Sequence, residues 1–261
     1  MLDGGLGTTL EALDADVSGP LWSARAVREA PATVRRAHEA FFEAGADVAT
    51  AATYQTTDPG LIRAAVTLGR DARAGRAGLV AGSVGPYGAV RNDRSEYTGA
   101  YPMPKGGWKG FHAPRLDALR EAGVDLLVIE TFPRFDELRA VADLMTGTEM
   151  PALFSVTLRD AFHLPDGTLL ATVARFLDAH PAVDALGINC VPATLVLPAL
   201  ATLRRHTAKP LAAYPKTAPP EALAWLEAGA RIVGGCCGTT PSHIRAIRRL
   251  LDASPHVSAA S

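Results

Sequence analysis

The sequence predicts an α/β protein that folds as a single (β/α)8 TIM barrel. Short apolar segments alternate with amphipathic helical patterns, and about eight such units occur along the chain. The length of 261 residues is typical of one barrel. Because no linker divides the chain, we expect residues 1–261 to form one domain, with a disordered tail at 254–261.

The predicted strands are short runs rich in Val, Ile, Leu and Ala. Runs that are apolar throughout, rather than alternating, are typical of parallel strands covered on both faces. They span residues 46–51, 78–83, 125–130, 152–156, 185–189, 210–214 and 231–234. Residues 1–3 would add a very short first strand, which brings the count to eight.

The predicted helices carry apolar residues on one face, and several end at a glycine. They cover residues 31–44, 114–122, 135–145, 169–179, 193–206, 219–228 and 241–251. Thr8 and Glu11 would form a capping box at the first helix. The segment 85–110 is rich in Gly, Pro and Tyr and has no clear period. We therefore expect it to be a long loop on the face of the barrel where sites are built.

Composition excludes several classes of function. The chain has 26 basic and 27 acidic residues and no long block of one sign, so no nucleic-acid partner is expected. We find no secretory signal at the N-terminus and no run of about 18 apolar residues that would span a membrane. Three cysteines, two of them adjacent, indicate a reduced, cytoplasmic chain with a thiolate site. The sequence predicts no particular oligomeric state.

All three cysteines follow predicted strands directly. Cys190 comes after the strand at 185–189, and Cys236 and Cys237 come after the strand at 231–234. In a closed barrel these strand ends meet at one rim, so the three sulfurs can converge. Adjacent residues of a straight strand point to opposite faces, and the glycines on both sides of the Cys236–Cys237 pair give the backbone the freedom to turn.

Three thiolates suit zinc and leave one tetrahedral position open, which is typical of a catalytic site. A free thiol has a pKa near 8.5 and is mostly protonated at neutral pH, whereas a thiol bound to zinc is deprotonated. We therefore predict that the zinc activates a thiol substrate for attack on carbon. The structural alternative is that the cysteines are small apolar fillers of the barrel.

Polar residues follow other predicted strands at the same rim. Asp3 and Glu130 could bind a substrate ammonium group, although a helix cap or an arginine partner would explain them equally well. Further candidates to line the pocket are Thr53, Tyr54, Gln55 and Ser83. The opening Gly4-Gly5-Leu6-Gly7 lacks the spacing of a nucleotide-binding motif. No histidine lies at metal-ligand spacing from another.

Eight segments along the chain match the motifs of one known family. They are residues 2–11, 21–24, 53–55, 80–88, 130–131, 157–160, 187–190 (GINC) and 234–241 (GGCCGTTP). The chain resembles the homocysteine S-methyltransferases, specifically the branch that uses S-methylmethionine or S-adenosylmethionine rather than betaine. The last two segments match the zinc signature of that family.

The resemblance implies a function and a site. Zinc would be held by Cys190, Cys236 and Cys237, and the homocysteine sulfur would take the fourth position. Asp3 and Glu130 would hold the amino end of homocysteine. The homocysteine thiolate would displace the methyl group of the sulfonium donor in line, giving methionine. The matching motifs also place Gly4 and Asn189 at the substrate site.

The chain departs from the family pattern in two places. After the strand at 210–214 the family shows Tyr-Pro-Asn-Ser-Gly, whereas residues 214–218 here are Tyr-Pro-Lys-Thr-Ala and a long insertion is missing. The helical region after Thr57 is also shorter. Two alternatives therefore stay open: a zinc barrel that binds a thiol without catalysis, and a methyltransferase with another thiol or selenol acceptor. A purely structural zinc site is less favoured, because it would have only three protein ligands.

Overall fold

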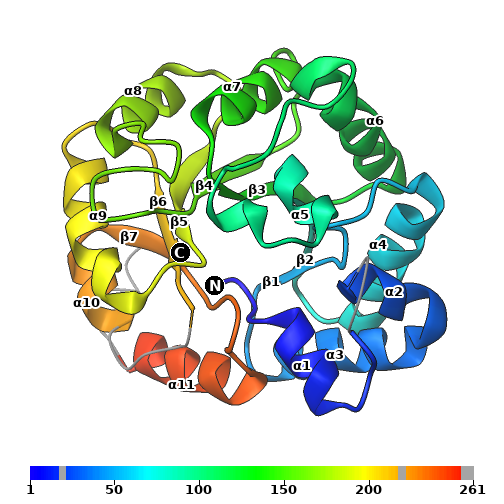
Figure 1. The fold of residues 1–261 in the computed structure, drawn as a ribbon. Coiled ribbons are helices and arrows are strands. Elements are labelled where there is room, and N and C mark those ends of the chain that lie inside the picture. The colour runs from blue at the N-terminus through cyan, green and yellow to red at the C-terminus, as the bar shows by residue number, and fades with distance from the viewer. Residues whose placement is uncertain (18–21, 217–221, 254–261) are drawn as a thin grey trace.

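A computed structural model of the chain describes residues 1–17, 22–216 and 222–253 (Figure 1). In this part of the chain seven parallel strands form one curled sheet in sequence order, and each strand pairs with the next. The strands are β1 (Val48–Thr50), β2 (Leu79–Val84), β3 (Leu126–Phe132), β4 (Ala152–Val156), β5 (Ala185–Asn189), β6 (Leu211–Tyr214) and β7 (Ala230–Val233). They coincide closely with the seven apolar runs of the sequence.

Helices surround the sheet in a ring (Figure 1). The α-helices are α1 (Leu6–Ala12), α2 (Trp22–Glu29), α3 (Pro31–Glu43), α4 (Pro59–Arg73), α5 (Tyr87–Arg91), α6 (Gly107–Ala122), α7 (Phe135–Leu144), α8 (Leu170–Ala179), α9 (Val196–Arg204), α10 (Ala222–Glu227) and α11 (Pro241–Asp252). Short 3-10 helices occur at η1 (Ser95–Tyr97) and η2 (Ala193–Leu195). The first residues predicted for the helix at 219–228, and the tail 254–261, lie outside the described residues. None of the helices that the structure describes is long and apolar enough to cross a membrane.

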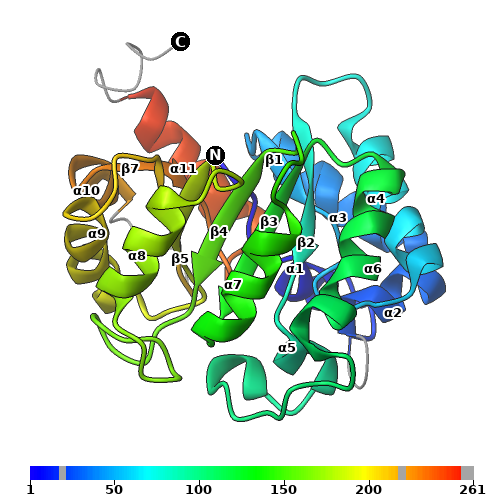
Figure 2. The ribbon, with the colours of Figure 1, turned by 90° about the horizontal axis from the view of Figure 1, so that it is seen from above.

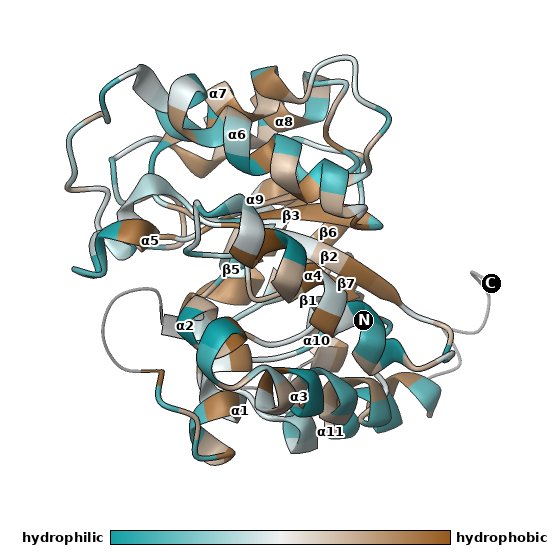
Figure 3. Cartoon of the chain, turned by 90° about the vertical axis from the view of Figure 1, so that its right-hand side faces the viewer, coloured by the Kyte–Doolittle hydropathy of each residue, from teal (hydrophilic) through white to brown (hydrophobic). Residues whose placement is uncertain are grey.

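The strands are apolar throughout because both of their faces are buried. On one face Val80, Leu127 and Ile129 join the main core with residues of the surrounding helices. On the other face Ala81 and Val128, one position along, join a second cluster inside the curled sheet. Alternate residues thus serve two cores, which explains the absence of a polar/apolar alternation. Figure 3 shows the hydrophobic strands enclosed by helices whose outer surfaces are more polar.

The predicted eighth strand at residues 1–3 is reduced to an isolated bridge. Leu2 bridges Val48 of β1 in parallel, and its N–H donates to the Val233 carbonyl of β7 at 2.9 Å. The Asp3 carbonyl accepts from Gly235 N–H at 3.0 Å. The opening residues therefore lie between the first and last strands, which do not pair with each other. They are too few to form a ladder, because Gly4 and Gly5 already lead into α1.

One loop prediction and two helix predictions are wrong. The segment 85–110 is not only loop, since it contains α5 and η1, and α6 begins at Gly107 rather than at Pro114. Proline removes one helical hydrogen bond, but the buried side chains of Trp108 and His112 hold the first two turns in place. The capping box is also absent: Gly5 is the N-cap of α1, and the Thr8 hydroxyl accepts from Gly238 N–H instead.

Candidate metal and substrate site

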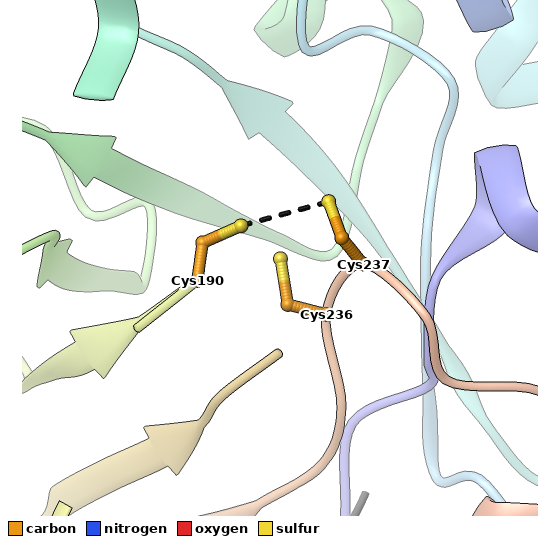
Figure 4. A group of neighbouring side chains, drawn as sticks. All are labelled: Cys190, Cys236 and Cys237. Atoms are coloured by element: carbon orange, nitrogen blue, oxygen red, sulfur yellow. Dashed lines mark hydrogen bonds between the residues drawn. The ribbon is translucent and has the colours of Figure 1, made fainter. Parts of the chain in front are cut away.

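The three cysteine sulfurs converge at the ends of β5 and β7 (Figure 4). Their sulfur atoms all lie within 4.8 Å of one another, and the Cys190 and Cys237 sulfurs are 3.6 Å apart. Tetrahedral zinc with Zn–S bonds of about 2.3 Å separates its sulfur ligands by about 3.8 Å. The spacing of the cluster therefore fits a single metal ion. Figure 2 shows α5 and its neighbouring loop projecting beyond the end to which the strands point, which is the end that carries the cysteines.

Backbone conformations specific to each loop turn these side chains inward. Cys190 has φ +54°, in the left-handed region that residues with a Cβ rarely adopt. Its N–H still donates to the Tyr214 carbonyl of β6 at 3.2 Å, so the residue ends the ladder and turns away from it. Such outliers persist where the surrounding structure enforces them, and they cluster at functional sites.

The adjacent pair Cys236 and Cys237 depends on close backbone packing. A Cβ on Gly235 would lie 2.4 Å from Oγ1 of Thr239, so only glycine fits there. The Thr239 hydroxyl donates to the Cys236 carbonyl at 2.6 Å and accepts from Gly5 N–H at 2.8 Å. This threonine therefore ties the cysteine turn to the start of α1.

The electrostatics of the cluster favour a cation. Hydrogen bonds from the Cys190 and Cys236 thiols hold the pKa of Cys237 far below its usual value. The pKa of Cys236 is raised, because its thiol is hydrogen-bonded to Cys190 and Cys237 and is buried near their charges. One thiol thus ionises readily and the next resists, since like charges would accumulate in a buried site. A divalent cation bound by the three sulfurs would offset their negative charges and so allow all three thiols to ionise.

The cluster opens into a cavity of about 700 Å³. Residues from the ends of most strands line it, together with the loop around η1. Those used below are Asp3, Gly4, Tyr54, Gln55, Ser83, Arg94, Glu96, Tyr97, Glu130, Cys190, Lys216, Cys236 and Cys237.

Two carboxylates, the buried Asp3 and the half-buried Glu130, line the same cavity as the cluster. Asp3 accepts from Thr50 N–H at 2.7 Å and from the Thr50 hydroxyl at 2.8 Å. Glu130 accepts from the Ser83 hydroxyl at 2.5 Å and from the Asn189 amide at 3.3 Å. Burial raises the pKa of each to about 7, and for Glu130 the nearby charge of Asp3 adds to the effect. Among the described residues no cation pairs with either carboxylate, so both are suited to a ligand ammonium group.

The other predicted substrate residues fall into two groups. Gly4, Tyr54, Gln55 and Ser83 line the cavity, whereas Thr53 and Asn189 lie outside its lining. The Thr53 hydroxyl bonds to the backbone N–H and carbonyl of Ser83. Asn189 is fully buried and bonds to Thr131 and Ser155 as well as to Glu130. Thr53 and Asn189 therefore support the cavity through their bonds to the lining residues Ser83 and Glu130.

Sequence reasoning missed the side chains that the loop after β2 brings into the cavity. The Tyr97 hydroxyl lies 3.4 Å from the Cys190 sulfur and 3.9 Å from the Cys237 sulfur. Lys216 Nζ lies 3.9 Å from the centre of the Tyr97 ring. Arg94 and Glu96 come, like Tyr97, from the loop after β2, whereas Lys216 follows β6. The only signal of the loop after β2 in the sequence was an unusual content of Gly, Pro and Tyr.

Fold and site together define an α/β protein with a three-cysteine cluster that could hold a metal ion, and with two carboxylates in the same cavity. The family model of the homocysteine S-methyltransferases matches residues 1–251. The chain belongs to this family.

Relatives of known function agree with this assignment over nearly the whole chain. A homocysteine S-methyltransferase of Escherichia coli (strain K12) is 40% identical over 290 residues, covering 95% of this chain and 94% of the relative. A selenocysteine methyltransferase of Astragalus bisulcatus is 32% identical over 320 residues, covering 99% and 95%. Both alignments are longer than the chain of 261 residues, so these relatives carry segments that this chain lacks.

A solved structure confirms the architecture. The metallated form of the homocysteine methyltransferase MmuM from Escherichia coli superposes with a TM-score of 0.90 at 41% identity, covering 95% of each chain.

Proposed function

We propose that this protein transfers a methyl group from a sulfonium donor, S-methylmethionine or S-adenosylmethionine, to homocysteine, giving methionine. The observation that carries the proposal is that three converging cysteines share one cavity with two carboxylates, Asp3 and Glu130, to which no described cation is paired. Membership of the homocysteine S-methyltransferase family supports the same reaction.

Zinc is the metal that the cysteine cluster fits best. The donors are three soft thiols within 4.8 Å of one another, and their coupled ionisation calls for a divalent cation. A metallated form of the Escherichia coli relative is known. When bound, zinc supplies the acidity that keeps an incoming thiol deprotonated at neutral pH. Cys190, Cys236 and Cys237 would hold it.

The remaining residues bind and orient the substrates. Asp3 and Glu130 would bind the homocysteine ammonium group, because both line the cavity and no cation among the described residues pairs with them. Tyr54, Gln55 and Ser83 would line the substrate pocket, and Thr53 and Asn189 would keep that wall rigid. A Cβ on Gly4 would lie 2.7 Å from the Thr239 hydroxyl, so its role is to allow close packing of the backbone beside Asp3.

We also propose that residues 1–3 take the place of the eighth strand and close a (β/α)8 barrel. The zinc site would then lie at the C-terminal rim of one domain spanning residues 1–261. The cytoplasm, where thiols stay reduced, is the compartment that suits three free cysteines.

One assay tests the proposal. The purified protein is analysed for zinc content and then incubated with homocysteine and S-methylmethionine, S-adenosylmethionine or betaine, and methionine is measured. We expect one zinc per chain and methionine formation with a sulfonium donor but not with betaine. If the zinc-loaded protein formed methionine with neither sulfonium, the proposal would be wrong.

Two alternatives remain distinguishable. A selenol acceptor is favoured by the 32% identity to a selenocysteine methyltransferase, and it predicts faster methylation of selenocysteine or selenohomocysteine than of homocysteine. A thiol-binding protein without catalysis is favoured by the shortened segment after β6, where Lys216 projects into the cavity. It predicts homocysteine binding by calorimetry with no turnover.

A further inference from the structure

Glu96 is a buried carboxylate in the cavity wall that the proposed function does not use. It lies in η1, next to the tyrosine that contacts the cysteines, and only 9% of the residue is exposed. Its Oε2 atom has no hydrogen-bond partner in the part of the chain that the structure describes. A buried carboxylate oxygen without a partner is costly, so it indicates a missing ligand.

The surroundings of Glu96 differ from those of the other two carboxylates. Asp3 and Glu130 each accept hydrogen bonds from neighbouring donors and share one side of the cavity, as an ammonium group with three N–H donors requires. Glu96 Oε2 has no donor attached and is itself covered, so its negative charge acts on the cavity through space rather than through a hydrogen bond. Arg94 lowers the pKa of Glu96 from a distance but forms no ion pair with it among the described residues.

Glu96 also lies near the reacting centre. The charge of Cys237 contributes to raising the pKa of Glu96, after burial and the charge of Asp93. Glu96 in turn contributes to raising the pKa of Tyr54, whose main cause is burial. Glu96 lines the same cavity as Cys237 and Tyr54, so its charge would attract a cation that lies in this cavity close to the acceptor sulfur. Aromatic rings attract such cations as well.

We propose that Glu96 binds the positively charged sulfur of the methyl donor. This inference rests on the proposed function. A sulfonium has no N–H and cannot satisfy an acceptor that needs a hydrogen bond, but it pairs by charge with an oxygen that has no donor. Glu96 would thus distinguish the charged donor from neutral thioethers of the same shape.

The reaction itself removes this attraction. The acceptor thiolate forms a bond to the methyl carbon, and the bond from that carbon to the donor sulfur breaks. The bonding electron pair stays on the donor sulfur, which becomes a neutral thioether. Because the positive charge on that sulfur is lost, its attraction to the charge of Glu96 disappears and the demethylated donor is released. Glu96 therefore sets donor affinity more than the rate of the chemical step.

The test compares ligand binding to the zinc-loaded wild type and the Glu96→Gln variant by calorimetry, without acceptor. S-methylmethionine and methionine differ only by the methyl group and the charge on sulfur. We expect the variant to bind S-methylmethionine about 30-fold more weakly, the size of effect seen when one partner of a buried charge pair is removed. Methionine and homocysteine should bind the variant within about threefold of the wild type, which also shows that the pocket is intact.

The matched control is Glu121→Gln, which changes an exposed carboxylate of α6 outside the cavity and should leave all three affinities unchanged. Equal weakening of S-methylmethionine and methionine by Glu96→Gln would assign Glu96 to the shared ammonium group and overturn the inference, as would unchanged binding of S-methylmethionine. Because no turnover is needed, failure of this inference is separable from failure of the proposed reaction. In kinetics the variant should raise KM for the donor with kcat nearly unchanged.

Discussion

Replacing Asp3 with Asn should make the protein more stable at alkaline pH. Asp3 is 3% exposed, and burial raises its pKa from 3.8 to about 7 against the opposing effect of its two bonds from Thr50. No cation compensates its charge among the described residues. The folded protein therefore carries an uncompensated buried charge whenever Asp3 is ionised.

The size and sign of the effect follow from the shift. Because the pKa is higher in the folded state than in the unfolded state, the folded protein holds more protons between pH 3.8 and about 7. The free energy of unfolding therefore falls as the pH rises through this window, by about 1.4 kcal/mol for each unit. Between pH 5 and pH 8 about two units of the window are crossed, so wild type should lose about 3 kcal/mol that Asp3→Asn retains.

Urea unfolding of both proteins at pH 5 and pH 8 measures this difference. Comparing the two at each pH cancels changes that they share, including weaker metal binding in acid. Asp71→Asn, at an exposed position of α4, is the matched control and should differ from wild type by less than about 0.5 kcal/mol at both values. If the stability difference between Asp3→Asn and wild type did not grow with pH, the uncompensated charge would not exist. The variant should also bind homocysteine more weakly, since stability gained at a site commonly costs function.

Three further predictions concern the scaffold of the site. Gly235→Ala should destabilise the protein by about 1–3 kcal/mol and lower zinc affinity in a chelator competition, because the new methyl group overlaps Thr239. Its control is Gly110→Ala in α6, where nothing lies within 4 Å of the new methyl group, and this variant should be about 0.5–1 kcal/mol more stable in urea. If Gly235→Ala were the more stable of the two variants, the packing argument would be wrong. Arg115→Met should cost about 3 kcal/mol or more in urea unfolding and raise KM, because the buried guanidinium donates to the carbonyls of Tyr54, Thr56 and Gly85; an unchanged KM would mean that these bonds do not shape the pocket. Cys190→Ala should leave the purified protein with little zinc by elemental analysis, and a full equivalent would exclude this cysteine as a ligand.

Most of the fold could be predicted from the sequence, because strands buried on both faces consist almost entirely of apolar residues. Each run that is buried on both faces is apolar throughout, and the end of each run locates a rim residue such as Cys190 or Glu130. The convergence of the cysteines followed from topology alone.

What the sequence did not predict depends on irregular backbone and on distant contacts. The loop that carries Glu96 and Tyr97 passes through left-handed conformations at Asn92 and Arg94, which no periodic pattern reveals. The start of α6 was missed because a proline outweighed two buried aromatic rings in its first turns. The role of residues 1–3 depends on β1 and β7, which local propensity cannot represent.

The contacts of those first residues determine when the active site can form. Leu2 bonds to Val233, and Gly5 bonds to Thr239, which is 234 positions away in the chain. During synthesis Asp3 can bond early to Val48 and Thr50 of β1, but Leu2 and Gly5 lack their partners until β7 and the residues that follow it have been made. The proposed metal site needs Cys236 and Cys237, which follow β7, so a chain that ends before them cannot form it.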